Sequence, residues 1–122
     1  MNKIIFQKNG SEAEELFALK ANLHTHSVNS DGLFTPDELI SMYKEAGYDV
    51  LAFTDHRFVN KVSGYESNGM TLICGVELHP VGPRGIKWHI LALGVQEDFD
   101  NVLPETGQEA VDSVIANGGE RN

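Results

Sequence analysis

The sequence predicts an α/β fold in which parallel strands alternate with helices. Three short, mostly apolar runs, at residues 48–54, 70–78 and 89–95, have the length and composition of strands that are buried on both faces. Two further segments show apolar residues at helical spacing, and each opens with a Thr-x-x-Glu capping pattern. Strand-like and helix-like segments that alternate in this way are typical of βαβ architecture.

An earlier strand is expected to end at residues 23–26. The apolar residues from Leu16 to Leu23 extend this strand towards the N-terminus. Residues 1–21 are otherwise treated as an N-terminal lead-in segment, and residues 22–122 as the domain itself.

The first helix has three start signals that agree. Thr35 is a capping residue, Pro36 suits the first helical position, and Glu38 completes a capping box. Gly47 is expected to end the helix, because glycine accepts the backbone conformation that follows a last helical turn.

The remaining segments are a loop and a second helix. Residues 57–69 are polar and contain glycines, so we expect a loop that lines the functional site. The second helix should open at Thr106 and end at Gly118-Gly119. Cys74 is the single cysteine, which excludes an internal disulfide, and its place inside an expected strand suits a small core residue.

Composition narrows the classes of function. Apolar residues make up 41% of the chain, which argues against disorder, and there is no apolar run of the length that a membrane span or a secretory signal needs. A formal net charge of −9 argues against an extended nucleic-acid surface. A cytoplasmic protein is expected. Bound divalent cations would reverse the charge locally, so the bulk charge does not exclude a small anionic substrate.

Histidines and carboxylates gather where the expected strands meet loops, which is where α/β folds place functional groups. Two of these ligands, His24 and His26, alternate on one strand, so both imidazoles should face the same side. The other candidate metal ligands are Asp31, His56, Glu77 and His89. Imidazole with carboxylate suits Zn, Mn or Fe, with Mg also allowed. This set exceeds the needs of one ion, so we expect two or three divalent ions that activate water for attack on phosphorus.

Each motif also has a purely structural interpretation. A His-x-His pattern is common, Asp31-Gly32 alone is a turn signal, and Asp55-His56 alone fits a hydrogen-bonded pair at a strand end. Glu77 is harder to explain without a cation, because a carboxylate that closes an apolar strand is costly to bury. The metal interpretation is favoured because the structural one requires all these residues to coincide at the ends of consecutive strands.

Two residues are weaker candidates. His79 lies two positions after Glu77 and shares its face if the strand continues, but Pro80 favours a loop there. Arg84 is a candidate phosphate contact, although basic residues in a Gly- and Pro-rich loop are more often solvated surface.

Six motifs follow one another along the chain in a fixed order: Leu-His-Thr-His-Ser, Ser-Asp-Gly, Thr-Pro-Asp-Glu-Leu, Gly-Tyr-Asp-Val-Leu-Ala-Phe-Thr-Asp-His, Gly-Val-Glu and His-Ile-Leu-Ala-Leu-Gly. From about Asn22 onward this order resembles the polymerase-and-histidinol-phosphatase (PHP) domain. The Tyr-Lys-Glu-Ala-Gly-Tyr-Asp stretch is similar to the metallohydrolase branch that includes carbaryl-hydrolase-like proteins. The resemblance implies a metal-dependent phosphoesterase with a distorted, TIM-like (βα)7 barrel.

The resemblance also implies a role for each ligand. The two histidines of the His-x-His motif would bind a first metal, Glu77 would bridge the first and second, and His89 would bind the second. Asp31 and His56 would belong to a third. Asp55 would not bind metal but would orient its neighbour through a hydrogen bond.

The family pattern continues further than this sequence does. Family members follow the Gly-Gly helix end with an apolar strand that carries His-Pro, and later with Asp-x-His, whereas this sequence ends shortly after Gly118-Gly119. We therefore expect a truncated barrel in which each metal lacks part of its ligand set and a sheet edge stays open. Such a chain should bind metal weakly, have little activity and self-associate through that edge.

The candidate ligands and the resemblance lead to three hypotheses for the function. The first is a metal-dependent phosphoesterase that acts on a small phosphate mono- or diester. The second is an amide, carbamate or carboxyl-ester hydrolase on the same metals, because such ligand sets also polarise carbonyl groups. The third is a metal-binding fragment without catalytic activity.

Overall fold

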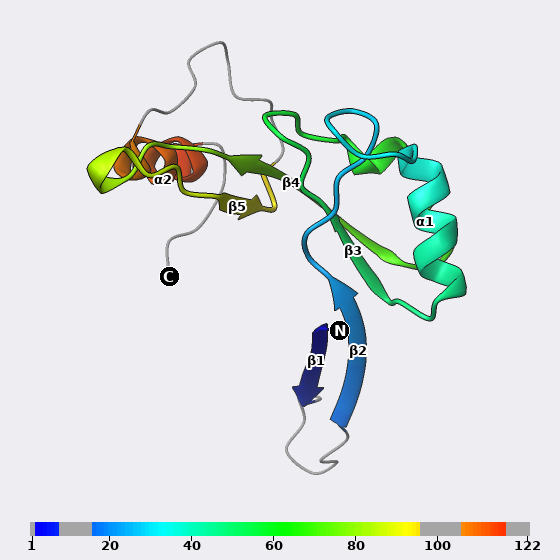
Figure 1. Ribbon diagram of the computed structural model, residues 1–122. Coiled ribbons are helices and arrows are strands. Elements are labelled where there is room, and N and C mark those ends of the chain that lie inside the picture. The colour runs from blue at the N-terminus through cyan, green and yellow to red at the C-terminus, as the bar shows by residue number, and fades with distance from the viewer. Residues whose placement is uncertain (1, 8–15, 96–105, 117–122) are drawn as a thin grey trace.

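The computed structural model describes residues 2–7, 16–95 and 106–116, which form a mixed α/β fold (Figure 1). Within these residues one sheet has the strand order β1-β2-β3-β4-β5. The strands are β1 (Asn2–Gln7), β2 (Leu16–Asn22), β3 (Val50–Phe53), β4 (Thr71–Leu78) and β5 (Ile90–Leu93). The helices are α1 (Pro36–Glu45) and α2 (Gly107–Ala116), with short 3-10 turns η1 (Val62–Gly64) and η2 (Pro83–Gly85).

The start and end of helix α1 confirm the sequence signals. The Glu38 amide donates to Thr35 Oγ1 (3.2 Å), and the Thr35 amide donates back to Glu38 Oε1 (3.3 Å), which completes the capping box. After the helix, Gly47 adopts a φ of +84°, a conformation that favours glycine. Leu39 and Ile40 are buried, and they hold the helix against β3 as the crossover between parallel strands β2 and β3.

The expectation that all strands run parallel is wrong at both ends of the sheet. Strands β2, β3 and β4 are parallel neighbours, but β1 is antiparallel to β2, and β5 is antiparallel to β4. The connection from β4 to β5 holds only the turn η2 and a bridge between Val81 and Lys87. A parallel return needs a crossover of about a dozen or more residues, usually a helix. The chain therefore folds back, and the start of β5 lies beside the end of β4.

The core has two parts, and partly buried Val62 packs against both of them. One cluster joins α1, β3 and the start of β4; the other joins β4, β5 and α2. Cys74 is buried in the second cluster, which confirms it as a core residue. Thr106 Oγ1 accepts from the Glu109 amide (3.1 Å) and so caps α2 as expected, while the predicted end at Gly118-Gly119 lies outside the described residues.

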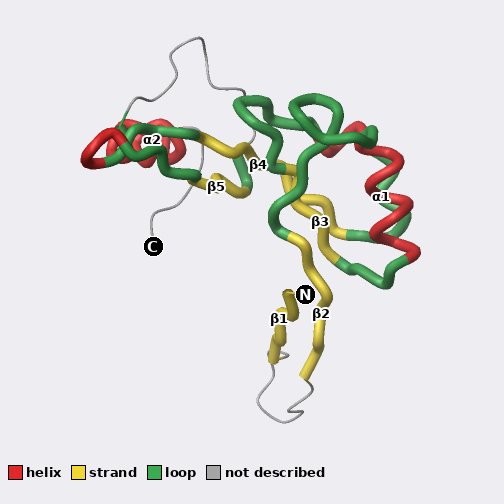
Figure 2. The backbone as a smooth tube through the Cα atoms, viewed as in Figure 1, coloured by secondary structure: helices red, strands yellow, loops and turns green. Residues whose placement is uncertain are grey.

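The strands β2 to β5 curl in a way that is compatible with part of a TIM-like barrel. The irregular segments that follow β2 and β3 lie close together beyond the strand ends (Figure 2). The segment 57–69 is irregular apart from η1, as expected. In the described part of the chain, no helix combines the length and the apolar character that crossing a bilayer requires.

Candidate metal centre

The site forms where β2, β3 and β4 end and β5 begins. His24 and His26 were expected on a strand, but β2 ends at Asn22 and both lie in the irregular segment that follows. Thr25, between them, is buried: its amide donates to Thr54 Oγ1 (3.0 Å), and its carbonyl accepts from the Thr54 amide (2.8 Å). This pairing keeps an alternation like that of a strand, so both imidazoles still turn to one side.

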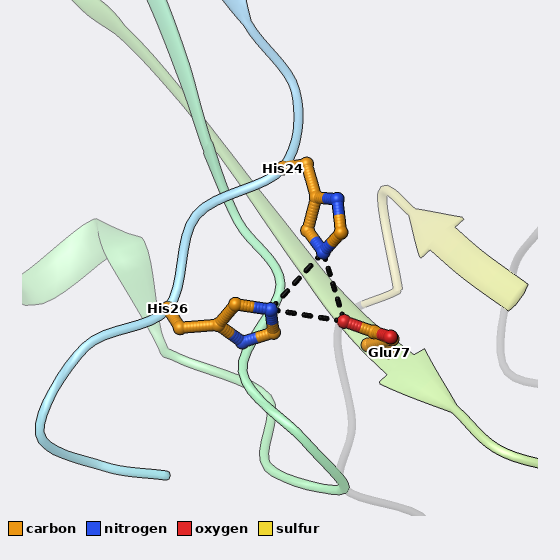
Figure 3. Close-up of side chains that lie close together, drawn as sticks. All are labelled: His24, His26 and Glu77. Atoms are coloured by element: carbon orange, nitrogen blue, oxygen red, sulfur yellow. Dashed lines mark hydrogen bonds and ion pairs between the residues drawn. The ribbon is translucent and has the colours of Figure 1, made fainter. Parts of the chain in front are cut away.

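Glu77, near the end of β4, is the centre of the site and is only 1% exposed. Its Oε1 lies 2.8 Å from His24 Nε2 and 2.9 Å from His26 Nε2, and these two nitrogens are 3.0 Å apart (Figure 3). Its Oε2 lies 2.6 Å from His89 Nδ1. His89 reaches Glu77 because β5 is antiparallel; at the start of a parallel strand it would lie at the opposite end of the sheet.

A second group forms around Asp31, on the loop after His26. Asp31 Oδ2 lies 3.1 Å from His56 Nε2, and Asp31 Oδ1 lies 3.7 Å from His26 Nδ1. The rings of His26 and His56 stack with their centroids 4.4 Å apart. His26 therefore stands between the two groups, with Nε2 towards Glu77 and Nδ1 towards Asp31.

His79 belongs to the site, although Pro80 favoured a loop position for it. Strand β4 continues to Leu78, so His79 stays on the side of Glu77, two residues on. Its Nε2 lies 2.5 Å from His56 Nδ1 and 3.7 Å from Glu77 Oε2. The structure thus brings all five histidines and both candidate carboxylates together.

The Glu77 carboxylate is ionised at neutral pH. Burial raises the pKa of this carboxyl, but hydrogen bonds from His89 and His24 and the nearby charges of His24 and His56 outweigh burial and lower the pKa to about 2. Burial also lowers the pKa of His79, which keeps its imidazole neutral and able to ligate a metal.

The donor set fits divalent metal ions. Three combinations of ligand atoms lie within 4.8 Å of one another: His24, His26 and Glu77; His26, Asp31 and His56; and His56, Glu77 and His79. Ligands of one tetrahedral ion at ~2.0–2.1 Å are roughly 3.3 Å apart, close to the separations around Glu77 Oε1. Among the described side chains, His26 Nδ1 is buried without a hydrogen-bond partner, as expected of a nitrogen reserved for a metal.

Asp55 makes a different contact from the expected one. Its buried carboxylate accepts from Ser27 and Ser30 in the loop that carries Asp31, and from Asn60, rather than orienting His56. Sequence reasoning gave no such role to Ser27, Ser30 or Asn60. Ser27 and Ser30 stand in the motifs Leu-His-Thr-His-Ser and Ser-Asp-Gly, but their partner lies 28 and 25 positions away, and Asn60 lies in a loop without periodicity.

A cavity of about 430 Å³ adjoins the metal ligands, and His24 and His26 are among the residues that line it. Its other walls are mainly apolar and include Phe34, Met42 and Tyr43, which the sequence did not single out. Arg84 is exposed in η2, and the described residues show no hydrogen bond or ion pair between it and the metal ligands.

Comparisons with known proteins agree with this geometry. Residues 22–115 match the PHP domain. The chain is 35% identical over 81 residues to a phosphoribosyl 1,2-cyclic phosphate 1,2-diphosphodiesterase of Eggerthella lenta, covering 62% of this chain and 31% of that protein. It is 36% identical over 91 residues to a 5'-3' exoribonuclease of Haemophilus influenzae, covering 70% of this chain and 31% of the relative. The chain thus spans about a third of the length of these relatives.

Proposed function

Because the chain belongs to the PHP domain family, we propose that its histidine and carboxylate centre hydrolyses small phosphate esters with the help of divalent metal ions. The observation that carries the proposal is Glu77. This carboxylate is almost fully buried, is ionised at neutral pH, and has His24, His26 and His89 within 2.9 Å. Two similar relatives are named as a phosphodiesterase and an exoribonuclease, which supports chemistry on phosphoric ester bonds.

Each protein group has a distinct task in the proposed reaction. Metal ions held there would supply an activated water and positive charge for an in-line displacement at phosphorus. Glu77 presents its two oxygens to different histidines, so it can bridge two neighbouring ions. Asp31 and His56 would hold a further ion beside His26. This set of two or three ions is a proposal, and its nitrogen and oxygen donors suit Zn, Mn or Fe.

The cavity beside the metal ligands suggests where the organic part of the ester lies. None of the residues that line it is a lysine or an arginine, so attraction for an anion would come from the metals. Phe34 and Met42 are partly exposed along its apolar walls and offer contact to an uncharged group. We propose a small phosphate mono- or diester, with phosphate at the histidines and the organic group towards α1.

A substrate panel tests the function. Purified chain is incubated with phosphate monoesters, phosphate diesters, carboxyl esters and carbamates, with Mn²⁺ or Zn²⁺ and with EDTA. Binding of inorganic phosphate to the metal-loaded chain is measured in parallel. We expect hydrolysis of phosphate mono- or diesters above that of Glu77→Gln, even if slow, and phosphate binding that requires metal. Glu66→Gln, a change on an exposed loop, is the matched control.

Three outcomes would contradict this proposal. Hydrolysis of carboxyl esters or carbamates alone would favour the second hypothesis from the sequence. Metal binding without phosphate binding or turnover would favour the third, a metal-binding chain without catalysis. Equal activity of Glu77→Gln and the original chain would show that the centre is not responsible.

A further inference from the structure

Asp55 anchors a loop rather than a metal ligand. Its carboxylate is completely buried and accepts four hydrogen bonds of 2.6 Å: from the amide and hydroxyl of Ser27, from Ser30 Oγ and from Asn60 Nδ2. A buried carboxylate is costly unless hydrogen bonds satisfy its oxygens. Three of its donors belong to the loop of residues 27–32, so this loop is fixed to the end of β3.

Asn60 connects that loop to the next one. It is completely buried, and its amide group donates to Asp55 while its Oδ1 accepts from Asn29 Nδ2 (2.6 Å) and Tyr65 Oη (2.9 Å). The Tyr65 ring packs edge-on against Phe53 of β3, with centroids 5.6 Å apart. A continuous set of contacts therefore runs from the core through Tyr65 and Asn60 to the loop.

The loop carries Asp31, whose side chain is 66% exposed and cannot be positioned by packing alone. Its neighbour Ser30 is one of the donors to Asp55, and the Gly32 amide donates to the Ser27 carbonyl (2.8 Å), which closes the loop. Fixing the backbone on both sides of Asp31 keeps its carboxylate 3.1 Å from His56.

We propose that Asn60 and Tyr65 are positioning residues for the metal held by Asp31 and His56. They act through the side chain of Asp55 and the loop. The pair of His24 and Glu77 meets this set only at the backbone, where the Glu77 amide donates to the Asp55 carbonyl (3.0 Å), so it should depend on them much less. This inference rests on the proposed metal centre. Residues outside the ligand shell that orient it are typically worth 10–100-fold in metal affinity.

Metal titrations on five variants of the full chain test the inference. Asn60→Ala removes the central connection, Tyr65→Phe removes one hydroxyl, and Asp31→Asn removes the ligand itself. The double variant Asn60→Ala with Asp31→Asn tests whether the two act together. Tyr48→Phe is the control, because it removes the hydroxyl of another partly buried tyrosine, which packs against the core cluster of α1 and β3. Binding of Mn²⁺ and Zn²⁺ is measured by calorimetry, and metal-free thermal unfolding is recorded for each variant.

We expect Asn60→Ala to lower the affinity for one ion by about 10-fold or more. This should be the same ion whose affinity Asp31→Asn lowers. The affinity for the other ion, and both affinities of the control variant, should be unchanged. Tyr65→Phe should show a smaller loss at that ion, and it carries the test if Asn60→Ala does not fold. The double variant should bind no more weakly than Asp31→Asn. If Asn60→Ala lowered the affinity for every ion equally, or if the losses of affinity were additive in the double variant, the inference would be overturned. A chain without any Asp31-dependent ion would overturn the metal assignment, and the inference with it.

Discussion

At the scale of single residues, the centre depends on one buried carboxylate. Glu77 was expected to bridge two metals, and its two oxygens do face different histidines, His24 and His26 on one side and His89 on the other. Its role as a metal ligand stays a prediction. The lowered pKa of Glu77, about 2, gives that role a measurable consequence.

Glu77→Gln should lower metal affinity and should not move its pH dependence to higher pH. Protons compete with metal at imidazoles, which ordinarily titrate near ~6.5, so affinity should be highest above pH 7 and fall towards pH 5. Glu77 stays ionised across this window because its pKa is about 2, and its charge raises the pKa of His79, so its removal favours the neutral imidazole. Chelator-competition titrations between pH 5 and 8 should show a loss of about 10-fold or more in Glu77→Gln, with a midpoint that is unchanged or lower. A midpoint that moves to higher pH would contradict this account.

At the scale of elements, the loop after β2 is held by close backbone packing as well as by Asp55. A Cβ at Gly32 would lie 2.2 Å from the carbonyl oxygen of His26, a distance that backbone atoms cannot accept. Asp31-Gly32 was read as either a turn signal or a metal ligand followed by glycine. The structure gives the glycine a steric reason of its own, which supports the turn interpretation, and the role of Asp31 as a metal ligand stays a prediction.

Gly32→Ala should therefore displace the loop and weaken the Asp31 group. We expect a cost of about 1–3 kcal/mol in the free energy of unfolding, typical of overpacking, and a loss of the Asp31-dependent ion. Gly64→Ala is the matched control, because a Cβ there meets nothing within 4 Å, and it should change stability by less than about 0.5 kcal/mol. Urea unfolding and metal titration measure both. Equal effects of the two substitutions would show that the packing at Gly32 is unimportant.

At the scale of the whole molecule, the proposed ions would tie together segments far apart in the chain. Their candidate ligands lie after β2 and β3, at the end of β4 and just before β5. A metal that binds only the folded chain stabilises it by an amount that grows with the logarithm of the free metal concentration relative to the dissociation constant.

Saturating metal should thus raise the thermal stability of the chain. At a free concentration 100 times the dissociation constant, the gain is about 2.7 kcal/mol, which corresponds to roughly 10 °C or more for a chain of this size. Calorimetric melts with Zn²⁺ or Mn²⁺, with EDTA added afterwards, measure the shift and its reversal. The melting temperature of the Glu77→Gln variant should rise much less when metal is added. A melting temperature independent of metal would argue against ions that join these segments.

The edge of the sheet supports the expected self-association. Strand β5 is an outer strand of the described sheet, and Leu91 and Leu93 on one of its faces are each 37% exposed. Leu93→Lys should reduce association, because a charged residue on an edge strand opposes pairing with another chain. Ile86→Lys, at an apolar residue that is 59% exposed outside the strands, is the control. Sedimentation at several concentrations would detect the difference, and a monomer at all concentrations would exclude the proposal.

Local patterns in the sequence determined most of the elements and nearly all the candidate ligands. Capping residues, apolar runs and histidines near strand ends form patterns over a few neighbouring positions, so they can be recognised in a single sequence. The assignment to the carbaryl-hydrolase-like branch, the count of seven βα units and the metal identity stay predictions.

Only the tertiary structure decided three features: the antiparallel β5 that brings His89 to Glu77, the inclusion of His79, and the contacts of Asp55 with Ser27 and Asn60. The contacts of His89, His79 and Ser27 join residues 12 to 28 positions apart, and Asn60 lies in a loop without periodicity. Such partners are chosen by how the chain folds back on itself, which leaves no repeating pattern in the sequence.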